Sequence, residues 1–173
     1  GRLNDIAAVG KLCKVRGVTL LLDAVSSFGA EQINAPGWNL GALAATANKC
    51  LHGAPGLSFV LARNELWAGP AQQAGSIYLD LRAYHATQHR DGYSPFTLPV
   101  QVAFALHEAL LEHAEQGGAE ARRQLYRARA QRYADAIRVR IPDRVPTTAF
   151  TGDLQQHLVG VTPGDFFYDY PQA

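Results

Sequence analysis

The sequence lacks methionine altogether, has only two cysteines among its 173 residues, and carries a formal net charge of only +1. Two cysteines, Cys13 and Cys50, cannot form a disulfide framework, and the first residues show no signal-peptide pattern, so we expect a reducing cytoplasm. The near-zero net charge argues against nucleic acid or an anionic membrane surface as a partner. No run of about 18 apolar residues offers a membrane span. Because methionine is absent and the sequence starts inside a helical pattern, we expect an interior piece of a longer protein.

The first third of the sequence alternates between helix and strand patterns. Apolar residues recur at helical spacing from Ile6 to Cys13, with Asn4-Asp5 as an N-cap and Gly17 as a stop. The apolar run 18–22, ended by Asp23, is typical of a strand buried on both faces of a parallel sheet. Further strands are predicted at 40–47 and 57–62. The sequence therefore predicts an α/β fold with at least three strands.

The second half is predicted to be loop and then helical. Residues 69–95 are rich in Gly, Pro, Gln, His and Tyr, which favours mostly loop. Thr97 is expected to cap a helix with Pro99 in its first turn, ended by Gly117-Gly118. A second helix follows, and its arginines are expected to form a solvated face: Arg122, Arg123, Arg127, Arg129 and Arg132. After Pro142 the signals are weak.

Two charged residues stand at the ends of predicted strands. Asp23 lies where ligands of open α/β sheets bind, although it could instead cap the next turn through Ser26 or Ser27. Lys49 follows the apolar run 42–47, and a lysine desolvated in such a place becomes a nucleophile able to form a Schiff base. The alternative is a surface lysine whose stem covers apolar neighbours.

The two residues together match what pyridoxal phosphate needs, namely a lysine for its aldehyde and an aspartate that keeps its ring nitrogen protonated. Other sites fit less well. His107, Glu108 and His113 do not have the spacing of a His-Glu-x-x-His zinc helix, so no metal site is predicted. Residues 53–56 are a turn rather than a phosphate loop, because no Gly-Lys-Ser/Thr follows.

The segments LDAVSSFG (22–29) and ANKCLHGAPG (47–56) resemble class V aminotransferases of pyridoxal phosphate fold type I. Within that family they are most similar to the branch that acts on an aminophosphonate, and SIYLDL (76–81) and FTLP (96–99) match it in the same order. The resemblance covers about residues 1–140. It implies that residues 1–116 are the C-terminal part of the large three-layer α/β/α domain. Residues 117–173 would be an interdomain helix and an incomplete small domain.

The resemblance also implies roles for single residues. Lys49 would be the Schiff-base lysine, and Asp23 would pair with the pyridine nitrogen. Val25 would pack against one face of the cofactor ring, and Asn48 would lie beside the cofactor. Thr97 would reach the cofactor phosphate of a neighbouring subunit, which implies a homodimer with shared active sites.

By the same resemblance, other parts of the site lie outside this sequence. A phosphate-cradling loop and a ring-stacking aromatic would precede Gly1, and an arginine for the acidic group of the substrate would follow Ala173. The tail 152–173 matches the family poorly. We therefore expect an aminophosphonate-to-pyruvate transaminase whose present piece is inactive alone. A family member using serine, alanine or glyoxylate, and a non-catalytic α/β remnant without cofactor, remain the alternatives.

Overall fold

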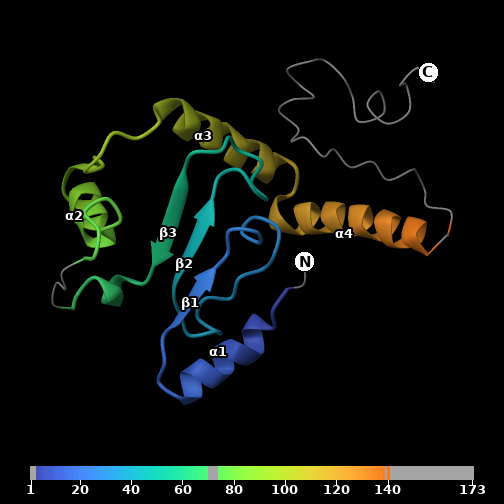
Figure 1. Cartoon of the computed structure of the whole chain (residues 1–173), viewed down its shortest axis with the longest axis horizontal. Coiled ribbons are helices and arrows are strands. Elements are labelled where there is room, and N and C mark those ends of the chain that lie inside the picture. Colours follow the sequence, from blue (N-terminus) through green and yellow to red (C-terminus); the bar gives the residue numbers. More distant parts are fainter. Residues whose placement is uncertain (1–2, 70–73, 139, 141–173) are drawn as a thin grey trace. The chain divides into compact units, whose positions relative to one another are not determined.

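The computed structural model describes residues 3–69, 74–138 and 140. The elements, in order along the chain, are α1 (Ile6–Val15), β1 (Leu20–Asp23), β2 (Leu40–Thr46), β3 (Ser58–Ala62), the short 3₁₀ helix η1 (Asn64–Leu66), α2 (Leu81–Asp91), α3 (Val100–Glu115) and α4 (Gly118–Ile137) (Figure 1). The described residues divide between two units, one up to Arg123 and one from Gln124. The predicted α/β character and all three predicted strands are confirmed.

The sheet has the order β1-β2-β3, with β2 in the middle. β1 and β2 are parallel, with Asp23 opposite Ala44, whereas β2 and β3 are antiparallel (Figure 1). The carboxyl ends of β1 and β2 therefore meet at one edge of the sheet. Asp23 and the residues that follow Thr46 leave the sheet at that edge.

The core lies on one face of the sheet. The buried cluster consists of Ala24, Leu40, Leu43 and Ala45. Partly buried side chains from the strands and from the segment after β1 pack against it: Leu20, Leu22, Phe28, Ile33, Ala35 and Phe59. Phe28 and Phe59 meet edge to face with ring centroids 5.3 Å apart, a favoured aromatic geometry. The expected burial of β1 on both faces is not found in the described residues, because Leu21 on the other face is 69% exposed. The segment that follows β1 covers only the face to which Leu22 belongs.

The predicted first helix and its cap are confirmed. The Asp5 side chain accepts a hydrogen bond from Ala8 N at 3.0 Å, which satisfies one of the free amides at the start of α1. Gly10 is the buried residue of α1, and its backbone lies so close to Trp38 that a Cβ would be 2.6 Å from Trp38 O. α1 therefore packs against the segment between β1 and β2.

The prediction of mostly loop for 69–95 missed the helix α2, which takes up residues 81–91. Asp80 caps this helix by accepting from Arg82 N and Ala83 N, and Gly92 ends it with φ +78°. The helix is mostly polar, so it lacks the apolar periodicity on which the prediction relied. The Arg82 guanidinium donates to backbone carbonyls of Trp67 and Gly69, which ties α2 to the segment after β3.

One expectation about the last helices is wrong, and another holds only in part. The N-cap of α3 is Pro99, not Thr97, and no side chain caps it. Pro99 disfavours a helical backbone at Leu98, so the helix cannot extend back to Thr97. Of the arginines expected on a solvated face, Arg127 and Arg129 are exposed. Arg122 is only 4% exposed, and its guanidinium donates to Gln116 Oε1 at 3.0 Å. Across the described ranges, no helix is both long and apolar enough to span a membrane.

Candidate active site

Asp23 is placed by the end of β1. The ladder continues one residue further, with Ala24 N donating to Ala44 O at 2.9 Å, and the backbone then turns through residues 24–30. Asp23 Oδ1 accepts from Val25 N at 2.9 Å. Asp23 thus caps its own turn, although through Val25 rather than Ser26 or Ser27. Its side chain is exposed, and Oδ2 has no partner among the described residues. We call residues 23–30 the Asp23 turn.

Lys49 lies in a closed loop that follows β2. Gly53 N donates to Ala47 O at 2.8 Å, and His52 N donates to Lys49 O at 2.9 Å. His52 has φ +63°, an unusual backbone for a residue with a side chain. Ala47 and Cys50 are buried on either side, yet Lys49 itself is exposed. We call residues 47–53 the Lys49 loop.

Of the two interpretations of Lys49, its exposure agrees with a surface lysine and not with a desolvated one in the described part of the protein. The flanking side chains point into the core, while the lysine stem does not. Nothing among the described residues forms a hydrogen bond or ion pair with the Lys49 ammonium. The ammonium is thus open to a ligand.

The structure brings the Asp23 turn and the Lys49 loop together. Cys50 Sγ donates a hydrogen bond to Ser26 O over 3.4 Å, although 24 positions separate the two residues in sequence. Leu51 packs directly against Gly29, where a Cβ would lie 2.8 Å from Leu51 Cδ2. A carboxylate and a primary amine, neither neutralised by a described neighbour, consequently stand at one sheet edge.

The three other predicted site residues have different surroundings. The Val25 side chain is half-buried in the Asp23 turn. Asn48 is exposed, and its Oδ1 lies 2.8 Å from Thr46 Oγ1, which also donates to Leu57 O at 3.0 Å. Thr97 is exposed ahead of α3, and within the described residues no hydrogen bond joins it to the Asp23 turn or the Lys49 loop. The structure therefore groups Asp23, Val25, Asn48 and Lys49 but not Thr97.

α3 supports this edge of the sheet. His113 Nε2 lies 2.6 Å from Gly29 O in the Asp23 turn, and Val102 lies against Gly56 just beyond the Lys49 loop. Sequence reasoning considered His113 only as a metal ligand and did not find this contact. No local pattern marks a contact between residues 84 positions apart.

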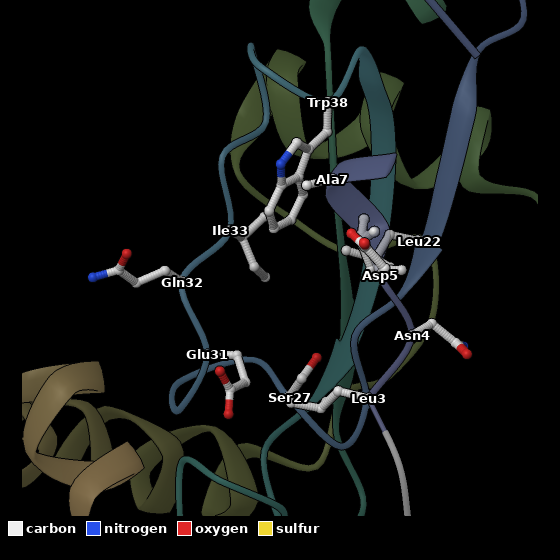
Figure 2. Close-up of a pocket in the computed structure, with 11 residues that line it drawn as sticks. Leu3, Asn4, Asp5, Ala7, Leu22, Ser27, Glu31, Gln32, Ile33 and Trp38 are labelled. Carbon is white, nitrogen blue, oxygen red and sulfur yellow. The ribbon is translucent and has the colours of Figure 1, made fainter. Parts of the chain in front are cut away.

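A separate cavity of about 250 Å³ lies on the covered side of the sheet (Figure 2). Its walls are Leu22, Ser27, Glu31, Ile33 and Trp38 together with the chain that leads into α1. Neither Asp23 nor Lys49 lines it. In the part of the chain that is described, no three His, Cys, Asp or Glu side chains gather in a way that could hold a metal ion.

Comparisons with known proteins identify relatives of this chain. The family model "Aminotransferase class-V" matches residues 1–157. A 2-aminoethylphosphonate–pyruvate transaminase of Pseudomonas fluorescens (strain Pf0-1) is 40% identical over 131 residues, which are 76% of this chain and 36% of the relative. The 2-aminoethylphosphonate–pyruvate transaminase of Pseudomonas putida (strain W619) is 43% identical over 126 residues, which are 73% of this chain and 34% of the relative. The chain thus spans about a third of the length of these curated relatives.

Solved structures give the same fold. Pyridoxamine–pyruvate aminotransferase from Mesorhizobium loti matches with a TM-score of 0.69 and 25% identity over 90% of this chain and 43% of that one. Alanine–glyoxylate aminotransferase from Nostoc sp. matches with a TM-score of 0.65 and 24% identity, and the match covers 80% of this chain and 39% of that one. The expected α/β fold is confirmed by these likenesses.

Proposed function

This chain belongs to the class V aminotransferase family, and from that membership we propose that its whole protein transfers the amino group of 2-aminoethylphosphonate to pyruvate, giving phosphonoacetaldehyde and alanine. The family has fold type I and depends on pyridoxal phosphate. The relatives at 40% and 43% identity, both 2-aminoethylphosphonate–pyruvate transaminases, support this choice of substrates. Serine or alanine with glyoxylate is the alternative that assays must separate.

One observation carries the proposal. Asp23 and Lys49 leave two adjacent parallel strands at the same edge, and Cys50 and Leu51 join the two segments directly. The two groups fit the cofactor. Asp23 Oδ2, which has no partner among the described residues, can accept a hydrogen bond from a ring N–H, and the Lys49 amine, which also has none, can react with an aldehyde.

When bound, pyridoxal phosphate supplies a conjugated ring that accepts electron density from the reacting carbon of the substrate. Asp23 Oδ2 would accept a hydrogen bond from the protonated ring nitrogen, and its negative charge would keep that nitrogen protonated. Lys49 Nζ is the group that would hold the cofactor through its aldehyde, with water as the leaving group. As a free amine, Lys49 Nζ would also be the base that moves a proton at the reacting carbon of the substrate.

We propose supporting roles for the remaining three residues. Val25 would bury one face of the ring, and Asn48, held by Thr46, would lie beside the cofactor. Thr97 would bind a phosphate together with the amides at the start of α3, where no side chain acts as a cap. Anions are favoured there by both the free N–H groups and the helix dipole.

We propose a homodimer in which Thr97 serves the site of the partner. Large apolar side chains that flank Thr97 in the sequence are exposed in the described residues, namely Leu98 at 40%, Val100 at 57% and Phe104 at 70%. Exposed apolar side chains that gather in one patch mark an interface. Residues 1–116 would belong to the large domain and 117–173 to an interdomain helix and part of a small domain. Neither Cys13 nor Cys50 forms a disulfide, which agrees with the reducing cytoplasm that we propose.

Borohydride reduction followed by peptide mapping tests the cofactor assignment on the whole protein. The pyridoxyl label is expected on Lys49, and a Lys49→Ala variant should carry none and lose transamination. Lys11→Ala, which removes an exposed lysine of α1, is the matched control and should label normally. A label on Lys11 or Lys14, or full activity of Lys49→Ala, would overturn the proposal.

A further inference from the structure

Lys49 needs help from its neighbours to be placed accurately. Its side chain is a flexible stem, and within the described chain nothing holds its ammonium. The position of Nζ relative to Asp23 is therefore set by the backbone of the Lys49 loop. Reactive groups must be held within about 0.5 Å of their working geometry by surrounding contacts.

Two contacts lock the Lys49 loop onto the Asp23 turn. Cys50, the residue next to Lys49, is buried and directs Sγ at the backbone oxygen of Ser26, 3.4 Å away. Leu51 is 2% exposed and fills the space beside Gly29. Gly29 has φ +89° and no Cβ, and both properties permit the close approach.

The Asp23 turn is itself held from another direction. His113 of α3 contacts Gly29 O at 2.6 Å, so this turn lies between α3 and the Lys49 loop. A shift of the Asp23 turn away from the Lys49 loop would change the distance between His113 Nε2 and Gly29 O and so disturb this contact. The turn thus serves as a fixed reference for Lys49.

We propose that the contacts of Cys50 with Ser26 and of Leu51 with Gly29, together called the inter-turn clamp, position Lys49 relative to the Asp23 carboxylate. Cys50 and Leu51 are then positioning residues rather than catalytic residues. This inference rests on the proposed function, because it assigns the clamp to the cofactor site. It adds a specific prediction, namely that loosening the clamp changes the chemistry at Lys49 before it changes the stability of the fold.

Cys50→Ala in the whole protein is the central test, and Cys13→Ala in α1 is its matched control. Cys50→Ala removes the thiol donor and is expected to raise the dissociation constant for pyridoxal phosphate about 10-fold. The kcat at saturating cofactor should fall by a similar factor with KM for the amino donor unchanged. Cys50→Ser restores a donor and should recover part of both losses. Cys13→Ala should match the parent protein.

Gly29→Ala tests the second contact. The added methyl would lie 2.8 Å from Leu51 Cδ2 and should weaken cofactor binding in the same way. Gly17→Ala is its control, because Gly17 also has a positive φ, +65°, but has open space around it. Thermal unfolding of each apo variant separates a positioning effect from a general loss of stability.

The outcomes divide cleanly. If Cys50→Ala keeps the parent dissociation constant and kcat, or loses only melting temperature, the clamp does not position Lys49 and the inference is wrong. A Gly29→Ala protein that fails to fold leaves the Cys50 series as the deciding test. If instead Lys49→Ala retains cofactor labelling and activity, the proposed function fails independently of the clamp.

Discussion

Replacement of Asp23 by Asn removes one charge and almost nothing else. The amide oxygen of Asn can still accept from Val25 N, the bond that Asp23 Oδ1 makes at 2.9 Å. Asp and Asn are equivalent as local caps, and the side chain is exposed, so we expect the free energy of unfolding to change by less than about 0.5 kcal/mol. On the proposed pairing of Asp23 with the cofactor, what is lost is the negative charge beside the ring nitrogen.

That loss is expected to be large for catalysis. Without the carboxylate the ring nitrogen is no longer held protonated, and it accepts electrons poorly. Removal of one preorganised electrostatic contact commonly costs about 10²- to 10³-fold in kcat, or about 3 kcal/mol in the transition state. We expect Asp23→Asn to fall in that range while its thermal unfolding stays near that of the parent.

The control is Asp5→Asn, which makes the same chemical change at another exposed cap. Asp5 Oδ1 accepts from Ala8 N at 3.0 Å, so the local geometry is closely matched. Steady-state transamination by the whole protein is the assay, with thermal unfolding of both variants alongside. If Asp23→Asn turned over as fast as Asp5→Asn, Asp23 would be a turn cap only and its pairing with the cofactor would be refuted.

Three further predictions concern the whole protein and its parts. The complete enzyme should prefer 2-aminoethylphosphonate with pyruvate over serine or alanine with glyoxylate by at least ~100-fold in kcat/KM, and a clear preference for serine and glyoxylate would move it to the alternative. The isolated 173-residue chain should bind cofactor weakly and show no transamination, because it spans only 36% of the first relative, and robust turnover would contradict this. Mixing Lys49→Ala with Thr97→Ala subunits should restore about one active site per mixed dimer, whereas no recovery in a verified mixed dimer would argue against sharing through Thr97.

The elements that sequence predicted correctly are those whose pattern is local. α1 has its cap at Asp5, and the apolar runs that became β1, β2 and β3 are short and bounded by turns. α2 was missed because it buries no residue fully and shows no apolar stripe. Two residues nevertheless marked it, Asp80 as a capping side chain and Gly92 as a stop.

The site was predictable only in its chemistry. Asp23 and Lys49 were recognisable as residue types at strand ends, and the two strands that precede them pair in parallel in the structure. The contacts of Cys50, Gly29 and His113 were not recognisable, because each joins residues far apart in sequence. Thr97 was placed wrongly as an N-cap because the backbone effect of Pro99 on the residue before it outweighed the capping preference.

The exposed side of β1 connects the fold to the site. Side chains alternate along a strand, so Leu21 and Asp23 belong to the same face, opposite the core face of Leu22. A run of apolar residues indicates burial on both faces, and yet Leu21 is 69% exposed here. The chain spans about a third of its relatives, at 36% and 34% of their lengths, which leaves room for neighbours of β1 in the rest of the whole protein. We infer that the face carrying Leu21 is covered in the whole protein, and that Asp23 then lies at the rim of an enclosed site, where its charge acts most strongly on the cofactor.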